Sequence, residues 1–242
     1  MREDYRDLYR ELYLHHWWWR AREKLILKTL RAHEPAGGWK NILDVGCGDG
    51  LFFDRLSEFG EVEGVESSAA LVNPSGGHRS RIHVRPFDEN FRPGKQFSLI
   101  LMLDILEHLP DPAAALRHAL ALLAPQGRLL VTVPAFQWLW TNHDVINRHF
   151  TRYTRTTFRE LARQSGLCIQ AERYFYQWLL LPKLLTRLAE RIRDLPPQPS
   201  GIPPQRVNVL LYLLSRFEQS TWGALPWPFG TSLMIWGGKS PP

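Results

Sequence analysis

The strongest constraint on the fold is a glycine-rich turn that follows a short apolar segment. Residues 41–45 (Asn-Ile-Leu-Asp-Val) have the composition of a buried strand, and Gly46, Gly48 and Gly50 come directly after it. Three glycines this close together indicate a tight turn at which the backbone approaches a ligand. Residues 51–59 then predict a helix, so the turn joins a strand to a helix.

Apolar and helical segments alternate along the rest of the chain. Further strands are predicted at residues 62–66, 81–85, 97–103, 128–133 and 167–174, with helices at 112–123 and 157–166. Asp111 is the expected N-cap of the first of these helices, and Thr157 with Glu160 predicts a capping box for the second. This alternation predicts an α/β fold, a parallel sheet with helices on both faces.

The two ends of the chain predict additional helices. Residues 3–33 contain neither Pro nor Gly and predict one continuous helix. Residues 178–195 and 207–222 predict two more helices, which the proline-rich linker 196–204 separates. Residues 231–236 predict a last strand.

The predicted elements divide the chain into four parts. They are an N-terminal helical cap (1–38), an α/β core (39–176), a helical insertion (177–228) and a final core strand with a tail (229–242). A chain of 242 residues suits one large domain with appended helices.

Composition restricts the class of protein and its surroundings. With 44% hydrophobic and 22% charged residues the chain has the usage of a globular domain, which excludes a disordered tail or a fibre. Two cysteines are too few for a disulfide framework and fit a reducing compartment. The charged N-terminus and the absence of an apolar run of about 20 residues lead us to expect a cytoplasmic protein. The net charge of +6 permits an anionic partner, either nucleic acid or a membrane surface.

The residues around the turn favour one kind of nucleotide ligand. A dinucleotide-binding turn has the spacing G-x-G-x-x-G, whereas here Leu51 stands where the last glycine is expected. Asp44 and Asp49 would repel a pyrophosphate, and Glu66 lies at the end of the next predicted strand. A ligand with a ribose and an ammonium group but no phosphate suits this site better, and S-adenosylmethionine (SAM) is such a ligand.

Three segments together resemble the class I SAM-dependent methyltransferases. They are residues 42–50 (Ile-Leu-Asp-Val-Gly-Cys-Gly-Asp-Gly), 65–66 (Val-Glu) and 104–112 (Asp-Ile-Leu-Glu-His-Leu-Pro-Asp-Pro). The last is similar to a segment of the branch that includes ubiquinone and menaquinone methyltransferases. The resemblance covers residues 40–175 and 231–239 and implies a Rossmann-like seven-stranded sheet, an N-terminal helical lid and a helical insertion before the last strand.

The resemblance also implies which residues contact SAM. Those at or near strand ends are Asp44, Gly46, Cys47, Gly48, Gly50, Glu66, Asp88, Leu103 and Asp104. Asp44 and the turn would face the methionine part, and Glu66 would accept hydrogen bonds from the ribose hydroxyls. Asp88 would meet the adenine edge beside Phe87, and Leu103 with Asp104 would line the sulfonium end.

Several of these residues also have a purely structural interpretation. Asp44 could cap a helix, Glu66 could be a surface acid, and Asp88 could belong to a solvated loop. Cys47 is better explained as a small residue packed against the sheet than as a nucleophile. His108 could be a general base or a packing and capping residue.

His143, Asp144 and His149 follow the predicted strand 128–133, at the sheet edge where open α/β proteins bind ligands. One interpretation is a general base held by a carboxylate near the substrate. The alternative is a set of hydrogen bonds that fixes the loop. A metal site is disfavoured because these residues offer no third ligand in a fixed geometry, and no metal is expected.

The tryptophans at positions 17–19 allow two interpretations. Their helix could pack over the core, or it could form a lid over the cofactor and the acceptor. In the second case Arg20 or Arg22 could pair with the methionine carboxylate of SAM.

Residues 178–195 form an amphipathic pattern. Lys183, Arg187 and Arg191 are spaced by four residues and give one basic stripe. The apolar side is formed by Leu180, Leu181, Leu184, Leu185, Leu188 and Ile192. Such a helix either covers a sheet or lies at a membrane surface or over an apolar substrate.

The expected function is SAM-dependent methylation of a small-molecule or lipid-attached acceptor at O, C or N, either in the cytoplasm or at the inner face of the membrane. A nucleic-acid methyltransferase is the first alternative. It is disfavoured because residues 104–107 (Asp-Ile-Leu-Glu) lack the Pro-Pro pair of amino-directed DNA enzymes, and neither cysteine follows a proline. The second alternative is a non-catalytic SAM-binding scaffold that docks on a membrane through residues 178–222.

Overall fold

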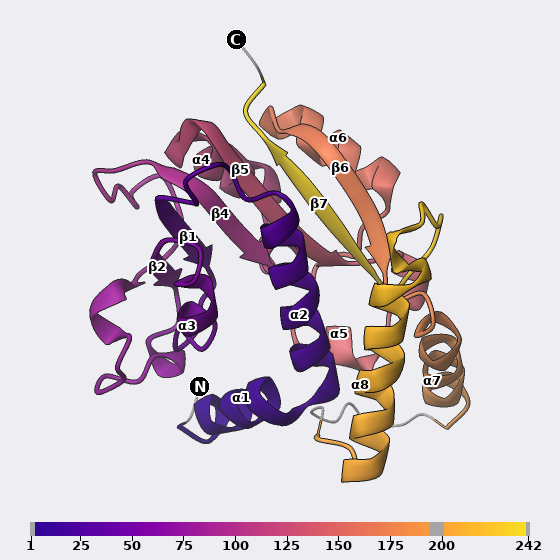
Figure 1. The fold of residues 1–242 in the computed structure, drawn as a ribbon. Coiled ribbons are helices and arrows are strands. Elements are labelled where there is room, and N and C mark those ends of the chain that lie inside the picture. The colour runs from indigo at the N-terminus through magenta and orange to yellow at the C-terminus, as the bar shows by residue number, and fades with distance from the viewer. Residues whose placement is uncertain (1–2, 194–200, 241–242) are drawn as a thin grey trace.

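The computed structural model describes residues 3–193 and 201–240. Their centre is a seven-stranded sheet of order β3-β2-β1-β4-β5-β7-β6 (Figure 1). The strands are β1 (Asn41–Val45), β2 (Glu61–Glu66), β3 (Ile82–Val84), β4 (Phe97–Leu103), β5 (Leu123–Pro134), β6 (Cys168–Phe175) and β7 (Ser232–Gly238). The predicted α/β class and the seven strands are therefore confirmed.

One strand departs from the parallel arrangement that the sequence predicts. β7 lies between β5 and β6 and runs antiparallel to both. Its first residue, Ser232, pairs with Phe175 at the end of β6. The helical excursion between these strands therefore leaves and returns at the same edge of the sheet, which forces the last strand to run in the opposite direction.

Helices cover both faces of the sheet, as predicted. They are α1 (Glu3–His15), α2 (Trp17–Ala32), α3 (Phe53–Leu56), α4 (Pro112–Leu122), α5 (Asn142–Ile146), α6 (Arg155–Ser165), α7 (Leu180–Arg193) and α8 (Gln205–Ser220). α4 and α6 pack together on one face, while α2 crosses the other face with α8 beside it (Figure 1). α3 forms only one turn after the glycines and is therefore shorter than the helix that residues 51–59 predict.

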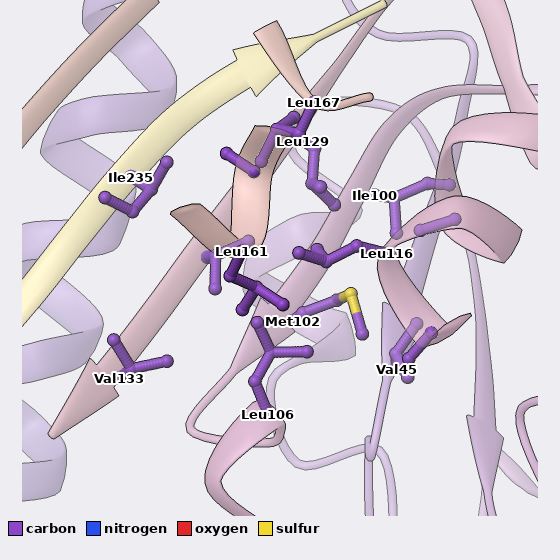
Figure 2. Packing of buried hydrophobic residues seen from close by; sticks show 14 of the residues in the cluster. Val45, Ile100, Met102, Leu106, Leu116, Leu129, Val133, Leu161, Leu167 and Ile235 are labelled. Carbon is purple, nitrogen blue, oxygen red and sulfur yellow. The ribbon is translucent and has the colours of Figure 1, made fainter. Parts of the chain in front are cut away.

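The core follows the two-residue period of the strands. In β4, Ile100 and Met102 point toward α4 and α6, where they meet Leu116 (Figure 2). Leu99 and Leu101 belong to the cluster on the opposite face, which α2 completes. All four strand side chains are fully buried, so the expectation of a central strand buried on both faces is confirmed.

The N-terminal segment forms two helices instead of the single helix predicted. The break lies at His16, whose backbone is extended and whose Nδ1 accepts a hydrogen bond from the Trp18 amide at 3.2 Å. The Asn208 side chain of α8 completes the break: it accepts from the Trp17 amide and donates to the His15 carbonyl, both at 2.8 Å. A contact from a distant helix thus replaces the intrahelical bonds, and no local signal predicts it.

The helix caps agree with the sequence in part. Asp111 accepts a hydrogen bond from the Ala114 amide at 2.9 Å and caps α4 as predicted. The capping box of α6 was predicted three residues too late. Thr154 is the N-cap, and Thr157 is its reciprocal partner. The Glu160 carboxylate bonds to Arg163 at 2.7 Å.

The C-terminal helices agree with their predicted positions. Of the proline-rich linker, residues 196–200 lie outside the described part of the chain, as do residues 194–195 of the helix predicted before it. Among the helices that the structure describes, none combines the length and the apolar character needed to cross a bilayer.

Candidate functional site

A large cavity lies at the carboxyl ends of β1, β2, β4 and β5. Its volume is about 1760 Å³, and its wall includes Asp44, Glu66, Leu103 and Pro134 from these strands. α1 and α2 close one side and α7 another. Small-molecule sites usually measure about 300–1,000 Å³, so this cavity has room for a cofactor and a second ligand.

The glycine turn forms the floor of the cavity. Gly46 has φ +73°, and a Cβ atom added to it would overlap the Cδ1 atom of Ile105. Gly48, with φ +54°, faces the Tyr9 ring of α1. Gly46, Cys47 and Gly48 line the cavity, whereas Gly50 is not part of its wall and packs against Phe53.

The two acids predicted beside the turn are both buried. Glu66 is 6% exposed and accepts hydrogen bonds from the Gly48 amide at 3.1 Å and the Ser68 amide at 2.8 Å. Asp44 is also 6% exposed. Burial raises its pKa to about 7, an effect that Arg22 opposes and Glu66 reinforces. Neither acid is a surface residue, and Glu66 holds the turn against the end of β2.

Asp88 does not lie with these residues. Its side chain is exposed and accepts a hydrogen bond from the Asn90 amide at 2.9 Å, which fixes a local turn. Phe87 beside it lines the cavity, but Asp88 does not. The Asp88 carboxylate therefore bonds within its own loop, and the predicted contact with the adenine edge stays a prediction.

Arg22 is the arginine of α2 that reaches the cavity. Its guanidinium forms an ion pair with Asp104, the residue after β4, and lies 5.2 Å from the centre of the Trp18 ring. Arg20 points elsewhere, over the ring of Tyr212 at 4.6 Å.

The three tryptophans lie between the core and the cavity, and their role as a lid stays a prediction. Trp17 belongs to the core cluster beneath α2. It also contributes to the cavity wall, as do Trp18 and Trp19.

Asp144 is the centre of a buried network behind the cavity wall, where its partners Thr141, His149 and Arg152 line the cavity. It is fully buried and accepts from Nε and Nη2 of Arg152 at 2.8 and 2.9 Å, from the Thr141 amide at 2.9 Å and from Nδ1 of His149 at 2.8 Å. Burial acts to raise its pKa, but the bonds from His149 and Arg152 hold the pKa well below its usual range.

Of the two histidines predicted with Asp144, only His149 is described with a hydrogen bond to the Asp144 carboxylate. His149 is the one that Asp144 holds, and its ring meets the His108 ring edge-on at a centroid distance of 4.6 Å. The His143 ring lies 6.2 Å from that of His149. All three rings line the cavity. Arg152 was not predicted, since its partner becomes apparent only when α5 and the following loop are folded.

Two further wall residues were not predicted as site residues. Glu107 follows β4 in a short turn and is 1% exposed. Burial raises the pKa of Glu107 well above its usual range, and the nearby negative charge of Asp104 adds a smaller effect in the same direction. Lys183 of α7 also lines the cavity, where burial lowers its pKa to about 8.

Comparison with known proteins agrees with this geometry. A family model described as a methyltransferase domain matches residues 6–172. The ubiquinone biosynthesis O-methyltransferase of Coxiella burnetii is 29% identical over 124 residues, which are 48% of each chain. That of Rhodopseudomonas palustris strain HaA2 is 30% identical over 104 residues, 40% of this chain and 41% of the relative. The chain therefore matches about half the length of these curated relatives or less.

Solved structures share the fold across almost the whole chain. A SAM-dependent methyltransferase from Thermotoga maritima, described as a possible histamine N-methyltransferase, has a TM-score of 0.60 at 18% identity and covers 98% of both chains. A TehB-like SAM-dependent methyltransferase from Corynebacterium glutamicum has a TM-score of 0.56 at 18% identity, with 98% of this chain and 97% of its own covered.

The strand order and the glycine turn beside Glu66 are those of the class I SAM-dependent methyltransferase fold, in which the bound cofactor is SAM. Since the family model matches more than half of the residues, the chain belongs to the methyltransferase-domain family.

The Asp144 network generates a stability prediction. The Asp144→Asn substitution leaves Arg152 buried without its charge partner, so the free energy of unfolding should fall by about 3–5 kcal/mol in urea titrations at pH 7. Because the folded-state pKa lies below the unfolded one, the carboxylate stabilises the fold above roughly pH 4 and loses this effect as the pH falls.

The matched control is Asp111→Asn, which keeps a good N-cap residue on α4 and should change stability by only a few tenths of a kcal/mol. Wild type and Asp144→Asn should approach each other in stability as the pH is lowered. An Asp144→Asn protein as stable as the control at pH 7 would contradict the role of this network.

Proposed function

We propose that this protein transfers the methyl group of SAM to a small-molecule or lipid-attached acceptor. The observation that carries the proposal is the 1760 Å³ cavity, whose wall contains both the glycine turn with Glu66 and the His108–His149 pair. The first group suits the cofactor and the second group suits a second ligand. The similarity to ubiquinone O-methyltransferases supports a small organic acceptor.

The cofactor side offers a partner for each part of SAM. Glu66 accepts one amide bond on each carboxylate oxygen, and the remaining lone pairs can accept the ribose hydroxyls. Asp44 attracts the ammonium group. Arg22 can exchange Asp104 for the methionine carboxylate, since both lie on the cavity wall. Leu103 then borders the sulfonium.

The acceptor side offers positioning and a base. Methyl transfer is an in-line displacement: the acceptor atom bonds to the methyl carbon, and the electrons of the C–S bond leave with the thioether. Alignment alone removes several kcal/mol of the barrier, up to about 7–11 in favourable cases. For a hydroxyl acceptor, Nε2 of His149 can take the proton while Asp144 holds Nδ1. His143 borders the same space.

The exposed face of α7 supports a lipid-attached acceptor. Leu181, Leu185 and Ile192 are 69%, 66% and 73% exposed, so this apolar side does not cover the sheet. Lys183 and Glu190 of the same helix line the cavity. We propose that the apolar side of α7 lies on the inner face of the membrane, so that an acceptor can pass from the lipid surface into the cavity.

The first experiment concerns the acceptor. Purified protein is incubated with SAM that carries a deuterated methyl group and with lipid or aqueous extracts of the source cells. We expect the label to appear in a small molecule or lipid by mass spectrometry. Incorporation into nucleic acid or protein alone, or into nothing in either extract, would overturn the proposed acceptor class.

The second prediction concerns Glu66. The Glu66→Ala substitution removes the ribose contacts and should weaken SAM binding by about 1–3 kcal/mol, or roughly 5- to 150-fold in Kd by calorimetry. Glu61→Ala, at the exposed start of the same strand, is the matched control and should bind like wild type. Equal affinity of the Glu66→Ala protein and the control would remove Glu66 from the cofactor site.

The third prediction concerns membrane contact. Wild-type protein should float with vesicles that contain phosphatidylglycerol, because α7 combines exposed leucines with arginines. The double substitution Leu181→Glu with Leu185→Glu should abolish flotation, because it places two carboxylates on the side of α7 that would enter the lipid surface. Thr156→Glu with Gln170→Glu adds the same charge at exposed sites elsewhere and should still float. Sedimentation of all three proteins would rule out the membrane proposal.

A further inference from the structure

Three side chains meet on the acceptor wall of the cavity without a role in cofactor binding. Glu107 and His108 come from the turn after β4, and His149 comes from the loop after α5. One donor atom of each lies within 4.8 Å of the others. All three residues line the cavity, so a ligand that they share would also reach the acceptor.

The Glu107 carboxylate has an oxygen atom that no described residue satisfies. The residue is 1% exposed, and its Oε2 atom has no hydrogen-bond partner within the residues that the structure describes. A buried carboxylate oxygen without a partner is costly, and buried acids are usually paired or bound to a metal. The two imidazoles beside it offer ring nitrogens of the kind that complete such a site.

One ring nitrogen of each histidine forms a hydrogen bond within the protein, as is usual for histidines that bind a metal through the other nitrogen. Nδ1 of His149 donates to the Asp144 carboxylate at 2.8 Å, which leaves Nε2 to face another partner. His108 forms a hydrogen bond with the backbone carbonyl of Asn147, and its second ring nitrogen can then bind another partner. Each ring is therefore oriented, and each keeps one nitrogen for coordination.

We propose that Glu107, His108 and His149 bind a divalent transition-metal ion of the Zn²⁺ or Co²⁺ type. Two imidazoles and one carboxylate favour such an ion over Mg²⁺ or Ca²⁺, which prefer oxygen ligands. Ligand distances of about 2.0–2.2 Å are required. Because the donor atoms lie within 4.8 Å of one another, modest side-chain rotations bring them together. A fourth position remains open toward the cavity.

The open position gives the ion a function that rests on the proposed methyl transfer. An acceptor hydroxyl bound there has a lowered pKa and loses its proton to solvent. Its oxygen then bonds to the methyl carbon of SAM, and the electrons of the C–S bond leave with the thioether. In the metal-bound protein His149 is a ligand, and the ion replaces it as the group that activates the acceptor.

The test uses Co²⁺ alone as the probe. The full chain is treated with a chelator, dialysed and titrated with Co²⁺ while visible absorption is followed. Wild type should saturate at one equivalent. Glu107→Gln, His108→Ala and His149→Ala should each weaken binding at least about tenfold, since each removes a ligand. His143→Ala is the matched control, because it removes a cavity histidine outside the three-residue cluster and should leave Co²⁺ affinity within about twofold.

Folding and cofactor binding are measured on the same samples. Each variant should keep its far-UV circular dichroism and its SAM affinity, and His108, which is exposed, is the variant least able to disturb the core. Two results would overturn the metal site: no saturable Co²⁺ binding by wild type, or equal binding by wild type and all three ligand variants. SAM binding that depends on Glu66 would stand in either case, so failure of the metal site is distinct from failure of the proposed function.

Discussion

The site depends on the close contact between the turn after β1 and the segment after β4. Gly46 lies so near Ile105 that a single methyl group would not fit between them. This contact fixes the glycine turn against residues 104–108, which begin with Asp104 and end with His108. The cofactor side and the acceptor side of the cavity are therefore parts of one packed unit, and a shift of either strand end would move both.

The proposed acceptor side has its own support in the Asp144 network. A fully buried carboxylate that engages Arg152 and His149 holds the loop after α5 against the cavity. Lys183 of α7 lines the same cavity, while Leu181, Leu185 and Leu188 of this helix are exposed. The helix therefore connects the interior of the site to the outer surface of the protein.

Local sequence patterns predicted the features that depend on interactions between residues near each other in the chain. The apolar run of β4 and the cap at Asp111 appear where the sequence places them, since burial period and capping act over a few residues. The prediction of one N-terminal helix was wrong because Asn208, almost two hundred residues away, bonds to the break at His16. The orientation of Asp88 depends on folding in a similar way: only in the folded loop does its short side chain bond to the Asn90 amide and not line the cavity.

The sequence alone determined the class of fold and the chemistry of the cofactor side, because the strand, the glycine turn and Glu66 lie within 26 residues and obey short-range rules. The tertiary structure decided the acceptor side. Glu107 and His149 are 42 positions apart in the sequence, yet they share one wall because parallel strands end at the same edge of a sheet. It also decided which side of α7 faces the cavity, since an amphipathic pattern defines two faces but does not say what each one contacts.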